Sequence, residues 1–159
     1  MIVSLISRFV KYKFPDVSNI STEEVSHLDQ DKTILVDTRK KEEYDVSFIP
    51  RAVHLEFPAS EDDVAKFVSE HVRDDTENVV CYCSLGYRSS IVAGLVTKHL
   101  KEHNMTNINV YNLEGSIFKW VNEDRPVLNT RLETVHYSHP FNIMWGLLGL
   151  SLSKWKWSQ

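Results

Sequence analysis

The sequence predicts an α/β domain, an open parallel sheet with helices on both faces. Two apolar runs, residues 33–37 and 78–83, have the length and composition of strands that are buried on both sides. Stretches with apolar residues at helical spacing, such as 61–73, lie between and after these runs. Strands that alternate with helices imply a parallel sheet, because each connection must cross back over the sheet.

The first 14 residues form a basic, amphipathic segment. It contains Arg8, Lys11 and Lys13 but no acidic residue, and apolar residues recur along it. This pattern fits either a helix that packs on the domain or a mitochondrial presequence. We expect the packed helix, because presequences are usually longer and richer in arginine and serine. Residues 1–17 are therefore treated as an N-terminal helical segment.

The remaining elements follow in the order that a parallel sheet requires. A capping box formed by Ser21 and Glu24 starts a short helix that runs through residue 28. Farther on, Arg39 and Glu43 are spaced for an ion pair at the next helix. After the short helix that ends at residue 28, the predicted elements are strand 33–37, helix 40–47, strand 52–55, helix 61–73, strand 78–83, helix 89–103, strand 108–111 and helix 116–122.

We assign residues 18–128 to the domain and residues 129–159 to a C-terminal tail. The tail contains the strongly apolar run 141–152, which is shorter than the roughly 20 residues that a membrane-spanning helix needs. A segment at a membrane interface is one interpretation, since two tryptophans follow the run. We expect instead that the tail packs back onto the domain, because the run is short and nearly free of basic residues.

Composition limits the classes of partner. The 159-residue chain has a net charge of −4, with 22 acidic residues and no basic stripe, so nucleic acid is not expected as a partner. The only two cysteines, Cys81 and Cys83, are two positions apart on a predicted strand, a spacing that rarely forms a disulfide. We therefore expect a reducing compartment, the cytoplasm, with the mitochondrion as the alternative.

The segment after strand 78–83 carries the chemistry. Cys83 stands at the carboxyl end of this strand and shortly before a helix, where backbone N–H groups and the helix dipole both favour the thiolate. Arg88 closes the loop with a permanent positive charge. Because the thiolate is the nucleophilic form, this arrangement indicates a catalytic cysteine. The alternative is a buried strand cysteine followed by an ordinary turn.

Three signatures occur in register along residues 18–128. The first comprises Asp37-Thr38-Arg39, Glu43-Tyr44 and Ile49-Pro50-Arg51-Ala52-Val53. The second is the pattern Cys-x-x-Gly-x-Arg-Ser, which begins at Cys83 after a hydrophobic strand. The third is a strand that ends in Glu114-Gly115, followed by Trp120 and Pro126. Together they resemble the signatures of the rhodanese family of sulfurtransferases.

The resemblance implies a function and a role for each site residue. A rhodanese-type enzyme moves a sulfane sulfur from thiosulfate or a persulfide to a thiol or cyanide, with Cys83 as the catalytic residue. No cofactor or metal is implied, and a protein sulfur acceptor is a further expected partner. The loop residues that would bind substrate are Ser84, Leu85, Gly86, Tyr87 and Arg88. The residues that would support the loop from behind are Asp37, Arg39 and Ser89.

The chain departs from the family pattern at three positions. The family usually has histidine at the position of Phe48, and glycine at the positions of Arg51 and Glu114. These positions lie in turns, so the departures concern local geometry. The residues of the catalytic loop are intact.

Two other functions remain open at the level of sequence. Dual-specificity phosphatases with a related fold have five residues between cysteine and arginine, whereas four separate Cys83 from Arg88, and residue 89 is serine. A shorter loop should form a smaller anion pocket, which suits a single sulfur better than a phosphate. A carrier that holds a persulfide for one protein partner would use the same residues as the enzyme, so the sequence does not separate these two functions.

Several residues outside the loop have both a structural and a chemical interpretation. His99 and His103 have the spacing of zinc-binding pairs, but no third ligand is evident and an exposed helix face is expected. Cys81 could serve as a resolving thiol, but we expect an inert core residue. His136 and His139 are expected to be loop residues.

Overall fold

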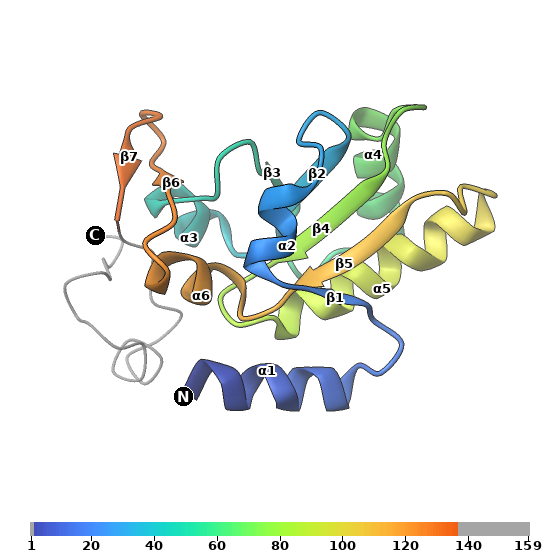
Figure 1. Ribbon diagram of the computed structural model, residues 1–159. Helices are drawn as coiled ribbons and strands as arrows, with labels where there is room; N and C mark the ends of the chain where they lie inside the picture. The colour runs from blue at the N-terminus through green and yellow to red at the C-terminus, as the bar shows by residue number, and fades with distance from the viewer. Residues whose placement is uncertain (1, 137–159) are drawn as a thin grey trace.

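We describe residues 2–136 of the chain in a computed structural model (Figure 1). The helices are α1 (Ile2–Lys13), α2 (Thr22–His27), α3 (Lys41–Val46), α4 (Glu61–His71), α5 (Tyr87–Glu102) and α6 (Ser116–Asn122). The strands are β1 (Asn19–Ile20), β2 (Thr33–Asp37), β3 (Val53–His54), β4 (Asn78–Tyr82), β5 (Asn109–Leu113), β6 (Val127–Leu128) and β7 (Thr134–Val135).

Five strands form one parallel sheet in the order β1-β5-β4-β2-β3. The fully buried β4 is the central strand, and its neighbour β2 pairs with it along its whole length, from Thr33 opposite Asn78 to Asp37 opposite Tyr82. The carboxyl ends of the two strands therefore meet at the same edge of the sheet. The predicted open parallel sheet is confirmed.

Side chains that alternate along the strands build one apolar core on each face of the sheet. Val80 and Tyr82 of β4 join the core beneath α2 and α6, whereas Val79 and Cys81 join the core beneath α4 and α5. Figure 1 shows α2 on the near side of the sheet and α4 and α5 on the far side. The predicted helices on both faces are confirmed.

Helix α1 lies below the carboxyl ends of β4 and β5 and the start of α5 in Figure 1. Val3 and Ile6 pack against the core beneath α2 and α6, and Val10 is buried. The Lys11 ammonium binds the Glu114 carboxylate at 2.8 Å. The N-terminal segment is thus a helix packed on the domain.

Some boundaries differ from the predicted ones because tertiary contacts set them. β4 ends at Tyr82, so Cys83 is the first residue of the following loop. α5 begins at Tyr87, two residues before the predicted start. The edge strand β1 was not expected: it is two residues long and pairs with β5, and so short a strand leaves no periodic signal.

The predicted end of the domain at residue 128 falls inside an antiparallel pair. β6 pairs with β7, so that Val127 lies opposite Val135, and Val135 packs against the core beneath α2 and α6. The expected packing of the rest of the tail, including 141–152, lies outside the described residues, as does His139. Over residues 2–136, none of the helices has the length and apolar character to cross a bilayer.

Candidate active site

The thiol of Cys83 lies almost completely buried at the carboxyl edge of the sheet. Its residue is only 3% exposed. The backbone N–H of Gly86 donates a hydrogen bond to Sγ at 3.1 Å, and the backbone N–H of Cys83 donates to Oγ of Ser116 at 3.2 Å. The sulfur is therefore held at the start of the loop by the loop itself and by α6.

Gly86 turns the loop into α5. It caps the helix with a φ of 109°, a left-handed conformation that favours glycine. A Cβ at this position would lie 3.2 Å from Nδ2 of Asn112, which is tighter than an ordinary contact. Glycine is thus the residue that lets this amide face the sulfur.

Arg88 is held by a buried carboxylate. Its Nη1 and Nη2 bind Oε2 and Oε1 of Glu43 at 2.7 and 2.9 Å, and Nη2 also donates to Oγ of Ser84 at 2.9 Å. The side chains of Arg88 and Glu43 are 11% and 4% exposed. Burial raises the pKa of Glu43, but the hydrogen bond and charge of Arg88 outweigh it, so this pKa lies below its ordinary value. The pair is therefore ionised and rigid.

Ser89 stands behind the sulfur at the start of α5. Its hydroxyl donates to Oδ1 of Asn112 at 2.6 Å, and Nδ2 of Asn112 donates to Oδ1 of Asn19 at 2.9 Å. The same hydroxyl and the backbone N–H of Ser89 also favour the ionised form of Cys83 and lower its pKa. The single hydroxyl proton can serve either acceptor, and hydrogen bonds to an ionised acceptor are the stronger ones.

These contacts separate the two cysteines chemically. Burial raises the pKa of the Cys83 thiol, but the Arg88 charge and hydrogen bonds from Ser89 and Gly86 outweigh it, so the pKa lies below its ordinary value. Cys81 is fully buried in the core beneath α4 and α5, and burial together with the Cys83 charge raises its pKa to about 12. Both thiols are free. Only Cys83 therefore has the character of a nucleophile.

Asp37 and Arg39 form a fully buried ion pair behind the loop. Nη2 of Arg39 lies 2.6 Å from Oδ2 of Asp37 and also donates to the backbone oxygen of Ser47 at 2.6 Å. The sequence prediction paired Arg39 with Glu43. In the structure, Glu43 binds Arg88 and feels Arg39 through its charge, because the fold brings α3 against the catalytic loop.

A pocket of about 420 Å³ lies against the catalytic loop and is lined in part by Cys83. Its lining from α1 consists of Leu5, Ile6, Phe9 and Val10, and its lining from the loop consists of Cys83, Ser84, Leu85, Tyr87 and Arg88. Four of the five loop residues predicted to bind substrate thus line the pocket. The fifth, Gly86, contributes its amide to the sulfur.

Sequence reasoning gave no site role to Glu43, Asn112, Ser116 or the apolar face of α1. Glu43 could be recognised as part of a signature. Its ion pair with Arg88 could not be predicted, because the two residues are 45 positions apart in the sequence. The role of Asn112 and Ser116 follows from how β5 ends and α6 begins beside β4, which no local pattern encodes.

The remaining candidates lie apart from this site. The rings of His99 and His103 stack with centroids 4.1 Å apart on α5. Across residues 2–136 there is no group of three or more histidine, cysteine, aspartate or glutamate residues that could hold a metal ion. His136 directly follows β7.

The lowered pKa of Cys83 predicts a pH dependence of its reactivity. The rate of alkylation by iodoacetamide should rise with pH and level off at a lower pH than the rate for glutathione, because the thiolate forms earlier. In Arg88→Met the rise should move to higher pH, and Arg88→Lys should restore it in part, since lysine keeps the charge. An identical pH profile for the wild-type protein and Arg88→Met would contradict this interpretation.

Comparison with known proteins agrees with this architecture. A family model described as a rhodanese-like domain matches residues 21–123. No curated protein matches the chain. A structure of an As-Sb reductase from Leishmania major has a TM-score of 0.61 at 20% identity, covering 77% of this chain and 92% of that chain. The structure of the BH2092 protein from Bacillus halodurans has a TM-score of 0.57 at 17% identity, covering 89% of this chain and 96% of that chain. A thiosulfate sulfurtransferase from Pseudomonas aeruginosa also gives 0.57 at 17% identity, covering 92% of this chain and 26% of that chain.

Proposed function

The chain belongs to the rhodanese-like domain family, and on that premise we propose that it is a sulfurtransferase acting through a persulfide on Cys83. The observation that supports this proposal most strongly is the environment of the Cys83 sulfur atom. Sγ of Cys83 is buried, accepts a hydrogen bond from the Gly86 amide, and has a pKa lowered by Arg88. Such preorganised donors stabilise a thiolate and, equally, a persulfide anion.

In the first step the Cys83 thiolate attacks the terminal sulfur of a donor. With an organic persulfide anion, the bond between the two donor sulfurs breaks, the Cys83 S–S bond forms, and the organic thiolate leaves. With thiosulfate, sulfite leaves instead. In both cases the charges balance, and the enzyme holds the new persulfide as an anion.

In the second step an acceptor attacks the terminal sulfur of the Cys83 persulfide. Cyanide leaves as thiocyanate, and an organic thiolate leaves as its persulfide, while the Cys83 thiolate is regenerated. This is covalent catalysis of the ping-pong type. The Glu43–Arg88 pair keeps the positive charge in place through both steps, since its side chains are nearly buried. A protein thiol is a further candidate acceptor.

A reducing compartment such as the cytoplasm suits this chemistry, because both cysteines are free thiols.

The loop favours persulfide donors over thiosulfate. Thiosulfate brings both of its negative charges within two bonds of the reacting sulfur, whereas glutathione persulfide brings only one there, and the loop's one cationic side chain, Arg88, is already engaged by Glu43. Placing an incompletely paired charge in an apolar pocket is costly. We expect kcat/KM for glutathione persulfide to exceed that for thiosulfate by about tenfold or more, a ratio that 1.4 kcal/mol of differential binding produces.

The same assay tests the proposed function against the phosphatase alternative. Initial rates would be measured with both sulfur donors, cyanide as acceptor, and p-nitrophenyl phosphate as a phosphatase substrate. The four-residue spacing between Cys83 and Arg88 provides a short ring of amides, so phosphate hydrolysis should stay at background. Phosphate hydrolysis without any sulfur transfer would overturn the proposal, and a higher kcat/KM for thiosulfate would overturn the donor preference.

A further inference from the structure

The pocket above Cys83 has one wall that the family model does not include. The region that the family model matches begins at residue 21, whereas α1 ends at Lys13. Leu5 and Phe9 of α1 line the pocket, yet they remain 59% and 57% exposed. Two large apolar side chains are therefore left partly uncovered beside a buried thiol.

This wall is fixed to the domain at a position where the chain departs from its family. The Glu114 carboxylate, at a position where the family usually has glycine, binds Lys11 of α1 at 2.8 Å. Val10 is buried, and its Cγ1 lies 3.7 Å from the Cβ position of Gly86 in the catalytic loop. The helix is thus anchored against the loop.

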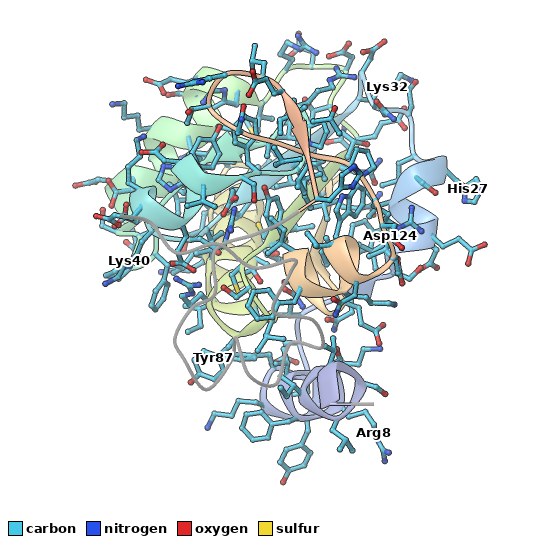
Figure 2. The ribbon with its side chains drawn as sticks, turned by 90° about the vertical axis from the view of Figure 1, so that its left-hand side faces the viewer. Arg8, His27, Lys32, Lys40, Tyr87 and Asp124 are labelled. Atoms are coloured by element: carbon cyan, nitrogen blue, oxygen red, sulfur yellow. The ribbon has the colours of Figure 1, made fainter. Side chains whose placement is uncertain are left out.

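The charges around the pocket are directed elsewhere. Arg88 is bound by Glu43, and Lys11 is bound by Glu114. Figure 2 shows Arg8 pointing away from the domain, on the side of α1 opposite Tyr87. Among the described residues that line the pocket, only Arg88 and the Cys83 thiolate carry a charge. An occupant would therefore meet mainly apolar surface next to Sγ.

The size and depth of the pocket favour a small molecule. Cys83 is 3% exposed, so a broad protein surface could not reach its sulfur. The volume of about 420 Å³ lies in the range of small-molecule sites. In a ping-pong reaction, the leaving thiolate and the incoming thiolate both lie on the far side of the transferred sulfur, so one pocket serves donor and acceptor.

From these observations we infer that α1 makes the enzyme selective for organic thiols, and the corresponding persulfides, whose bodies are apolar. Leu5 and Phe9 cover the apolar body while its sulfur meets Sγ of Cys83. The claim that these molecules donate or accept sulfur rests on the proposed sulfurtransferase function. The binding preference itself rests on the pocket alone.

Alkylation of Cys83 tests the preference without sulfur transfer. The rate of Cys83 alkylation would be followed by intact mass, once with N-benzyl-iodoacetamide and once with iodoacetamide. Each rate would be divided by the rate at which glutathione reacts with the same reagent, and the ratio of the two corrected rates gives the preference for the benzyl group. We expect the wild-type protein to favour the benzyl reagent by about tenfold, because its ring buries apolar surface against the wall. The double variant Leu5→Ser/Phe9→Ser should lose most of this ratio.

Tyr12→Ser is the matched control, since Tyr12 lies on the same helix, is 85% exposed and does not line the pocket. It should keep the wild-type ratio. If thermal unfolding shows that the double variant is not folded, Phe9→Ser alone provides the comparison. No benzyl preference in the wild-type protein, or an unchanged ratio in the pocket variant, would overturn the inference.

Turnover then links the pocket to the reaction. With phenylmethanethiol as acceptor, kcat/KM should fall about tenfold in the pocket variant, whereas cyanide, which has no body to bind, should be affected less than about twofold. Equal losses for both acceptors would contradict the assigned role of α1. If Cys83 accepts no sulfur from any donor, the proposed function fails, and the alkylation ratios still decide whether the pocket selects apolar molecules.

Discussion

Cys83→Ser is expected to reduce sulfur transfer to the uncatalysed rate while the protein stays folded. The serine hydroxyl is far less ionised than the thiol, and it cannot form a persulfide. The contacts that lower the pKa of Cys83 cannot ionise a serine hydroxyl near neutral pH, because its ordinary pKa is far higher. The rate of cyanide-dependent thiocyanate formation measures the loss, and circular dichroism reports the fold.

Cys81→Ser is the matched control for this variant. Cys81 is two residues away, within β4, where it is fully buried and its pKa is raised to about 12. A buried hydroxyl in this apolar core costs about 1–3 kcal/mol of stability, so activity should be expressed per folded molecule. Most of the activity should remain. Comparable losses in the two variants would remove the unique role assigned to Cys83.

Asp37→Asn is expected to produce the largest loss of stability, about 3–5 kcal/mol, because it removes the ionised carboxylate that binds the buried Arg39 guanidinium. Both side chains of this pair are 0% exposed, so the guanidinium is not solvated at the surface. The free energy of unfolding from urea titration would measure the change. Since the pair braces the end of β2 beside β4, activity should fall with the folded fraction.

Asp31→Asn provides the comparison at an exposed ion pair. Oδ1 of Asp31 lies 3.0 Å from Nη2 of Arg51, but these side chains are 88% and 55% exposed. Such pairs contribute little because water screens them. The free energy of unfolding should therefore stay within the error of the measurement. Equal losses in Asp37→Asn and Asp31→Asn would show that burial does not give the Asp37–Arg39 pair its importance.

The sheet and its covering helices were predictable because their signals are local. The runs 33–37 and 78–83 are apolar enough to mark buried strands, and the capping box of Ser21 and Glu24 is present as predicted. Elements whose existence depends on a distant partner were not predictable. β1 is held by β5, and β7 is held by β6, and each has only two residues.

For the site, the sequence predicted the loop but not what surrounds it. The order of residues from Cys83 to Arg88 was sufficient to place a thiol at the start of a helix. The partner of Glu43 was predicted incorrectly, because spacing along the chain suggested Arg39, whereas the fold brings Arg88 to it. The apolar wall from α1 was missed for the same reason, since its contact with the loop is entirely tertiary.

The most direct test of the proposed function is the intact mass of the protein after exposure to a donor. The protein would be incubated with glutathione persulfide and freed of excess donor. Its intact mass would then be measured before and after the addition of cyanide. A sulfurtransferase should gain the mass of one sulfur atom on Cys83 and lose it to cyanide as thiocyanate, whereas Cys83→Ser should gain none. A protein that never gains this mass, or gains it equally in Cys83→Ser, would contradict the persulfide mechanism.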